Sequence, residues 1–138
     1  MRVLNQVPYV SGNAIVFATD WNYFDFAVVA IQSLLNHLNH NVCIHVFTDV
    51  QDSKAMEEQF YESLDIPKQA SIAVYCIDDL IDLDSLKLKD SGYISKATYY
   101  RLIIPEVMQS YDRVLYLDSD ICVTHSLDEL FEIPFENE

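Results

Sequence analysis

Basic residues are scarce in this sequence. The 138 residues include 8 Lys and Arg against 22 Asp and Glu, which gives a formal net charge of −14 at pH 7. A protein that binds nucleic acid needs a basic surface to replace the counterions of the phosphates. The chain has too few cations for such a surface, so we expect no nucleic-acid partner. A diphosphate ligand would need local help from a metal ion, a helix N-terminus or a well-placed Arg.

Long apolar runs and paired cysteines are also missing. No apolar run approaches the roughly 20 residues that span a bilayer, and residues 1–6 lack the apolar core of a signal peptide. We therefore expect no transmembrane segment and a cytoplasmic protein. The three cysteines, Cys43, Cys76 and Cys122, lie far apart in apolar runs. This placement predicts reduced core thiols, and it excludes the paired spacing of a zinc site.

Apolar runs alternate with segments of helical periodicity along the chain. Four apolar runs predict strands, the first and the last of them buried: 14–18, 42–48, 71–77 and 113–117. Apolar residues at i, i+3 and i+4 spacing predict four helices: 24–38, 53–64, 95–104 and 127–131. Pro105 is expected to mark a kink or boundary, and Ser126 to cap the last helix. Residues 1–12 look irregular, and short helical turns are expected within 78–90.

This alternation predicts the fold class. Strands that alternate with helices form an α/β domain with a largely parallel sheet flanked by helices. The sequence contains no internal repeat and no low-complexity linker. One domain spanning residues 1–138 is therefore the simplest organisation.

Two carboxylates follow the last predicted strand, at Asp118 and Asp120, with Ser119 between them. In an extended chain, residues two apart share a face, so both carboxylates aim at one point and Ser119 turns away. Such hard oxygen ligands suit Mg, Mn or Ca. Open α/β sheets bind their ligands at the carboxyl ends of the strands, where this pair falls. Ordinary turn or helix-capping chemistry is the alternative.

A second group of polar residues follows the first predicted strand. Asp20 and Asn22 would open on the same crevice as the two carboxylates, and they suit hydrogen bonding to a nucleobase edge. Arg101, on one helix face with Ser95 and Thr98, would donate charge-assisted hydrogen bonds to phosphate. Two alternatives remain open: Asp20 only caps a helix, and Arg101 only pairs with a surface carboxylate.

Several aromatic and imidazole side chains need an interpretation as well. Trp21 and Tyr23 suit either the core or the wall of the crevice. His45 is expected to be a sheet residue with satisfied hydrogen bonds rather than a ligand. His37 and His40 are expected to be exposed residues near the end of the first helix, where cations suit the helix dipole.

Three segments, in this order along the chain, resemble glycosyltransferase family eight. They are Phe17-Ala18-Thr19-Asp20-Trp21-Asn22-Tyr23, then Tyr93-Ile94-Ser95-Lys96-Ala97-Thr98-Tyr99-Tyr100-Arg101-Leu102, then Val114-Leu115-Tyr116-Leu117-Asp118-Ser119-Asp120. This family contains retaining glucosyl- and galactosyltransferases, among them the bacterial lipopolysaccharide galactosyltransferases and glycogenin. Residues 127–131 also resemble the segment that follows the family's Asp-X-Asp motif.

The resemblance implies a fold and an activity. The fold would be the nucleotide-binding half of the glycosyltransferase A type. The activity would be transfer of glucose or galactose from UDP-glucose or UDP-galactose to an acceptor, with retention at the anomeric carbon. Ala18, Asp20 and Asn22 would contact the uridine, and the backbone of Ser119 would lie beside it. The acceptor stays open among lipopolysaccharide, wall polymer, protein and glycogen primer.

The resemblance also implies a metal site. Asp118 and Asp120 would bind Mn (or Mg) together with the diphosphate, and Asp118 would lie near the ribose. Arg101 would reach the diphosphate or the sugar as the candidate catalytic residue. The metal and this guanidinium would stabilise the departing UDP.

The sequence departs from the family's pattern in one respect. Family members are much longer, and their C-terminal half supplies a third metal ligand, a His in a His-X-X-Gly-X-X-Lys-Pro-Trp-like segment, and most of the acceptor site. Neither is present here, and His125 does not match that His. We therefore expect half an active site, in a shortened chain, a split gene product or a reduced relative. The face left uncovered would favour self-association into a homo-oligomer.

Two other functions remain as alternatives. The first is a non-catalytic nucleotide-sugar-binding module that needs a partner chain to complete its site. The second is a Mg-dependent phosphohydrolase or a receiver-type phosphoacceptor. The sequence favours this second alternative least, because Cys122 departs from the dehalogenase-like signature and no late Lys is present.

Overall fold

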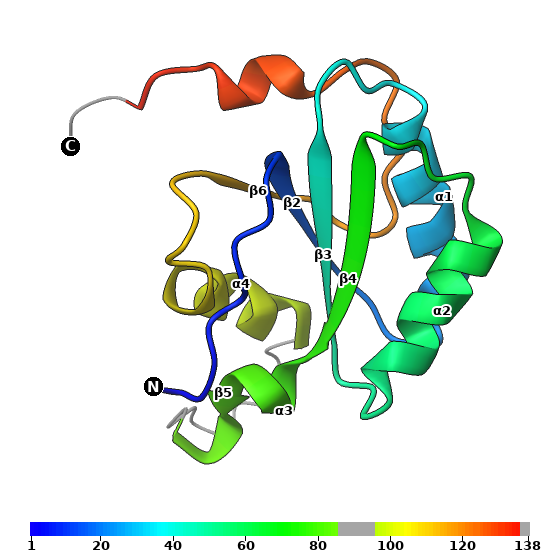
Figure 1. The fold of residues 1–138 in the computed structure, drawn as a ribbon. Coiled ribbons are helices and arrows are strands. Elements are labelled where there is room, and N and C mark those ends of the chain that lie inside the picture. Colours follow the sequence, from blue (N-terminus) through cyan, green and yellow to red (C-terminus); the bar gives the residue numbers. More distant parts are fainter. Residues whose placement is uncertain (86–95, 136–138) are drawn as a thin grey trace.

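The centre of the molecule is a parallel sheet. The computed structural model describes residues 1–85 and 96–135. The four strands of this sheet pair in the order β4-β3-β2-β6 (Figure 1), and all three pairings are parallel. The strands are β2 (Asn13–Ala18), β3 (Val42–Thr48), β4 (Ala70–Cys76) and β6 (Val114–Tyr116). The predicted α/β class with a largely parallel sheet is therefore confirmed.

Helices cover both faces of the sheet. Helices α1 (Phe24–Leu35) and α2 (Ser53–Ser63) pack on one face, and α4 (Lys96–Val107) packs on the other (Figure 1). Side chains of a strand alternate between the faces. Ile15 and Phe17 accordingly join the core under α1 and α2, whereas Val16 joins the core under α4.

The burial of the strands follows from their positions in the sheet. Strand β3 lies between two neighbours and under helices on both sides, so all seven of its residues are buried. Strand β6 lies at the edge, and its three residues are only half-buried. The prediction of a buried last strand was therefore wrong in length and in degree. Among the cysteines, Cys43 and Cys76 are buried as predicted, but Cys122 lies beyond the short strand and is exposed.

Short elements join the ends of the chain to the sheet. Strand β1 (Arg2–Val3) pairs antiparallel with β5 (Ile81–Asp82), which corrects the expectation of an irregular start. Helical turns were expected within 78–90, and the described part of this range contains two, α3 (Ile77–Leu80) and η1 (Leu83–Ser85). Residues 86–95, which include Ser95, lie outside the described residues.

Two helices differ from their predicted ends. Helix α4 continues through Pro105 to Val107, where a boundary or kink was expected. Val107 and the following Met108 are buried in the core, and the Met108 amide donates to the carbonyl oxygen of Ile104 at 3.0 Å. Tertiary packing therefore holds the last turn despite the proline. Helix α1 ends at Leu35 rather than residue 38, because the chain reverses there to enter β3.

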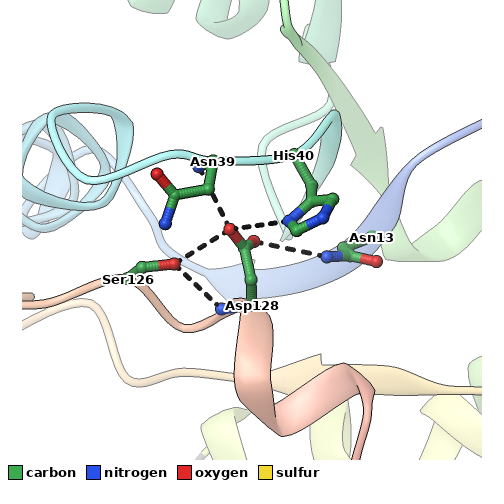
Figure 2. Close-up of polar contacts among 5 residues, drawn as sticks. All are labelled: Asn13, Asn39, His40, Ser126 and Asp128. Carbon is green, nitrogen blue, oxygen red and sulfur yellow. Dashed lines mark hydrogen bonds and ion pairs between the residues drawn. The ribbon is translucent and has the colours of Figure 1, made fainter.

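The C-terminal segment is fixed by one carboxylate (Figure 2). Asp128, at the start of the 3₁₀ helix η2 (Asp128–Phe131), accepts a hydrogen bond from the backbone amide of Asn39 at 3.0 Å. Its oxygens also lie 3.0 Å from His40 Nδ1, 2.9 Å from Ser126 Oγ and 3.4 Å from Asn13 Nδ2. The predicted helix is thus a 3₁₀ turn, and the Ser126 hydroxyl accepts the Asp128 amide as expected. We call these five residues the Asp128 cluster.

The exposure and hydrogen bonding of the His side chains agree only in part with the predictions. His37 and His40 are exposed, as expected, although His40 also pairs with Asp128. His45 is buried, and its Nε2 atom lies 3.0 Å from the Tyr111 hydroxyl. Within the described part of the chain, no hydrogen-bond partner reaches His45 Nδ1, so the expectation of a fully satisfied residue was wrong. Burial lowers the pKa of His45 from 6.5 to about 4.

Across residues 1–85 and 96–135, the search for membrane-spanning helices finds none of sufficient length and apolar character.

Candidate functional site

A cleft of about 530 Å³ opens at the carboxyl ends of three strands. The lining residues lie on β2, β6 and α4 or follow β2, β3 and β6: Ala18, Thr19, Asp20, Tyr23, Asp49, Tyr100, Tyr116, Asp118, Ser119 and Asp120. Parallel strands end at the same edge of a sheet, which brings these separate segments together. Five of the seven predicted site residues therefore share one cleft.

The segment after β6 forms one wall of the cleft. The Leu117 amide donates to the carbonyl oxygen of Val16 at 3.0 Å, and the chain then turns at Ser119 and Asp120. The Ser119 hydroxyl donates a hydrogen bond to the carbonyl oxygen of Ala18. Ser119 is also among the residues that line the cleft. That its side chain turns away from the point at which Asp118 and Asp120 aim stays a prediction. Strand alternation ends with β6, and a turn obeys no such alternation.

The segment after β2 forms a second wall of the cleft. An Asp20 carboxylate oxygen accepts the backbone N–H of Tyr23 at 2.9 Å, just before α1 begins. The bond closes a turn ahead of the helix, because the N-cap of α1 is Tyr23 and no side chain caps this end. The alternative that Asp20 only caps the helix was therefore wrong, and Asp20 lines the cleft. The Thr19 amide donates to the Phe47 carbonyl oxygen at 3.0 Å, which extends the pairing of β2 and β3. Asn22 is exposed and is not among the lining residues.

Arg101 stands beside the cleft rather than in its lining. Its Nη2 atom lies 2.9 Å from Asp118 Oδ1, and its guanidinium carbon lies 5.2 Å from the centre of the Tyr116 ring. Hydrogen bonding to the Tyr116 side chain and to Asp118 raises the pKa of the Arg101 guanidinium. Arg101 thus pairs with an exposed carboxylate, and the partner is a predicted metal ligand. That it has no role beyond this pair is untested. The side chain of Thr98 lies outside the described residues.

Tyrosines and Asp49 complete the lining. The sequence left Tyr23 open between the core and the wall of the crevice, and it indicated no role in the site for Tyr100, Tyr116 or Asp49. Tyr100 is buried, and its pKa is raised by burial and by the negative charges of Asp49 and Asp20. The Tyr23 ring is exposed, so it forms part of the wall and not of the core. Asp49 follows β3 directly, and the rule that parallel strands end at one edge could have identified it.

The acidic residues bear on metal binding. In the described part of the chain, no group of three or more His, Cys, Asp or Glu side chains is placed to hold a metal ion. Asp118 and Asp120 are both exposed in the same cleft and offer carboxylate oxygens. Mg²⁺ is commonly held by one or two carboxylates together with substrate phosphates. The two residues therefore fit such an ion if the ligand supplies the remaining oxygens.

The sequence matches the family described as glycosyl transferase family 8 over residues 14–138. The chain belongs to glycosyltransferase family 8. Among its relatives is the lipopolysaccharide 1,3-galactosyltransferase of Salmonella typhimurium, which is 38% identical over 128 residues. Glycosyltransferase GlyB of Streptococcus pneumoniae is 34% identical over 123 residues. The lipopolysaccharide 1,2-glucosyltransferase of Escherichia coli is 33% identical over 122 residues.

Solved structures share the fold of this family 8 chain. The galactosyltransferase LgtC, in complex with donor and acceptor sugar analogues, is 27% identical with a TM-score of 0.58. The bifunctional glycosyltransferase WbbM has a TM-score of 0.70 at 24% identity, a likeness of fold alone. These likenesses confirm the predicted glycosyltransferase A type of fold.

This family 8 chain is short beside its relatives. The matches cover 90%, 89% and 86% of the chain but 36%, 29% and 34% of the Salmonella, Streptococcus and Escherichia proteins. The structural match to LgtC covers 88% of the chain but 42% of LgtC. The chain thus spans about a third of the length of these curated relatives.

Proposed function

We propose that this chain forms the donor-binding portion of a metal-dependent hexosyltransferase. The donor is UDP-glucose or UDP-galactose, and the hexose passes with retention to a saccharide acceptor such as lipopolysaccharide. The observation that carries this proposal is the cleft that joins Asp20, Asp118 and Asp120 at the carboxyl ends of β2 and β6. The names of the family 8 relatives, a galactosyltransferase and a glucosyltransferase, support the class of sugar.

The uridine would occupy the wall formed by the segment after β2. Asp20 has a second carboxylate oxygen beyond the one that accepts the Tyr23 amide, and a carboxylate can accept several hydrogen bonds. The exposed Tyr23 ring offers a flat apolar surface on which a base can stack. Ala18 and the Ser119 backbone would border the base, and Asn22 would contact it from the rim.

The diphosphate would lie at the wall formed by the segment after β6. Asp118 and Asp120 would hold Mn²⁺ (or Mg²⁺), which neutralises the charge of a departing diphosphate when bound. Arg101 stands next to Asp118 and would donate charge-assisted hydrogen bonds to the phosphate oxygens. In a chain with a net charge of −14, the diphosphate depends on these local positive charges.

A second candidate function is a nucleotide-sugar-binding module that transfers no sugar by itself. One observation favours it: in the described residues, no third side chain is placed with Asp118 and Asp120 to hold a metal ion. The two functions differ in one measurement, the release of UDP from UDP-glucose and UDP-galactose in the presence of an acceptor. A binding module binds UDP but cleaves neither UDP-glucose nor UDP-galactose.

The donor site is tested by calorimetric titration of UDP in the presence of Mn²⁺. We expect binding by the wild-type chain and at least tenfold weaker binding by the Asp118→Ala/Asp120→Ala double variant. The control is Asp112→Ala, which removes an exposed carboxylate just before β6. Asp112 lies at the amino ends of the strands, opposite the cleft. Equal affinities of the wild type and the double variant would contradict the proposal.

A further inference from the structure

We propose that Arg101 is a built-in counter-cation for Asp118. An incoming divalent cation must displace the Arg101 guanidinium from Asp118, and the guanidinium then binds the diphosphate of the nucleotide. This inference rests on the proposed function, because it takes Asp118 and Asp120 as the cation ligands. It adds a coupling to that function: the cation and the nucleotide each bind better in the presence of the other.

The contact between the two side chains carries the inference. Arg101 lies on α4 and Asp118 follows β6, so two separate elements meet at this pair. Arg101 Nη2 donates to Asp118 Oδ1 at 2.9 Å. One of the two Asp118 carboxylate oxygens is therefore already engaged by a positive group. A divalent cation at Asp118 would also stand close to the guanidinium, and like charges repel.

The exposure of the pair allows the exchange. The side chains of Arg101 and Asp118 are 55% and 52% exposed, so the ion pair can open without unfolding of the core. Exposed ion pairs are weak in water, and such a pair shifts a binding equilibrium by up to about fivefold. The free energy of the Arg101–Asp118 ion pair is therefore small enough for a divalent cation to overcome.

Tyr116 keeps the released guanidinium near the cleft. The Arg101 guanidinium carbon lies 5.2 Å from the centre of the Tyr116 ring, and this ring lines the cleft. A cation over an aromatic face is attracted to it independently of any carboxylate. Arg101 can thus leave Asp118 and remain beside the diphosphate site. A cation that binds alone leaves the guanidinium without an anionic partner, whereas the nucleotide supplies one.

This exchange makes the binding of cation and nucleotide mutually dependent. A coupling between two ligands is reciprocal, so each raises the affinity of the other by the same factor. Part of the coupling comes from direct contact between metal and phosphate, which Arg101 does not affect. The remaining part is the transfer of Arg101 from Asp118 to phosphate, and removal of the guanidinium abolishes this part only.

The test measures Mn²⁺ binding in the absence of nucleotide. Electron paramagnetic resonance reports the concentration of free Mn²⁺. We compare the wild type with Arg101→Gln, which removes the guanidinium, and with Lys68→Gln as control. Lys68 is exposed and precedes β4, at the edge of the sheet opposite the cleft, so its loss changes the net charge equally. We expect Arg101→Gln to bind Mn²⁺ about two- to fivefold more tightly and Lys68→Gln to match the wild type.

The second half of the test adds UDP. We expect Arg101→Gln to bind UDP more weakly than the wild type in the presence of Mn²⁺, and the factor by which Mn²⁺ raises UDP affinity to be smaller. An unchanged or weaker Mn²⁺ affinity of Arg101→Gln, in a wild type that binds UDP with Mn²⁺, overturns the counter-cation proposal alone. Failure of the wild type to bind UDP with Mn²⁺ overturns the proposed function and this inference together.

Discussion

The Ser119 hydroxyl donates a hydrogen bond to the carbonyl oxygen of Ala18, although 101 residues separate the two in sequence. This bond joins the segments after β2 and β6, which form the two walls of the cleft. It lies beyond the last paired residues of these strands, Val16 and Tyr116. The side chain of Ser119 therefore sets the spacing of the walls, a role that the sequence did not indicate.

Removal of this hydroxyl should loosen the cleft. We expect Ser119→Ala to lower the free energy of unfolding by about 1 kcal/mol, the usual contribution of one hydrogen bond. UDP affinity in the presence of Mn²⁺ should fall a few-fold as well, because the walls are no longer tied. Urea unfolding and calorimetry measure the two effects. The control is Ser63→Ala at the exposed end of α2, and equal behaviour of the two variants would refute the role of Ser119.

The exposed ring of Tyr23 should contribute to nucleotide affinity. Stacking of a base on an aromatic side chain is worth about 1–3 kcal/mol. Tyr23→Ala should therefore weaken UDP binding by roughly five- to 150-fold. Tyr9→Ala removes an equally exposed tyrosine that packs on Tyr111, away from the cleft lining, and should leave the affinity unchanged. A Tyr23→Ala variant with wild-type affinity would show that the base lies elsewhere.

The buried imidazole of His45 predicts a pH dependence of stability. Burial lowers its pKa from 6.5 to about 4, so the unfolded chain binds a proton more readily than the folded one. Its neutral form therefore contributes stability above pH 6.5, and this contribution is lost as the pH falls from 6.5 to about 4. The difference amounts to about 3 kcal/mol. Urea unfolding at pH 7 and pH 4.5 measures it.

The His45→Gln variant isolates this effect. It should lose less stability between pH 7 and pH 4.5 than the wild type, whatever its stability at pH 7. His37→Gln replaces an exposed imidazole and serves as control. Equal losses in the wild type and in His45→Gln would mean that His45 takes up its proton without cost to the fold.

The Asp128 cluster should stabilise the fold without affecting the cleft. Burial alone would raise the pKa of Asp128, but hydrogen bonds from His40, Ser126 and the Asn39 amide lower it. Asp128→Ala leaves these donors unpaired and should reduce the free energy of unfolding by about 2 kcal/mol. Glu129→Ala, at the neighbouring exposed position, should change it by less than about 0.5 kcal/mol.

The cluster lies near the amino ends of β2 and β3, opposite the cleft. Asp128→Ala should therefore retain the UDP affinity of the wild type in the presence of Mn²⁺. A parallel loss of affinity and stability would show that η2 also supports the donor site.

The sheet and the place of the cleft were predictable because both depend on strong local patterns. The continuous apolar runs of β2 and β3 indicate strands buried on both faces, and such strands are central in a parallel sheet. Asp20, Asp118 and Asp120 follow directly on strands, so the common edge of those strands brings them together.

Other features depend on contacts that no local pattern reveals. Two-residue strands such as β1 are too short to show a period. The last turn of α4 persists after Pro105 because Val107 and Met108 are buried, which is a property of the whole fold. The hydrogen bond of Ser119 depends on a turn, where the alternation of a strand no longer holds. The same early end of β6 leaves Cys122 on the surface.

The central claim is that this cleft binds a uridine diphosphate through a divalent cation. Calorimetric titration of the wild-type chain with UDP, once with Mn²⁺ and once with the metal chelated, tests it most directly. We expect at least tenfold tighter binding in the presence of Mn²⁺. Binding of the same affinity in both conditions, or no binding in either, would contradict it.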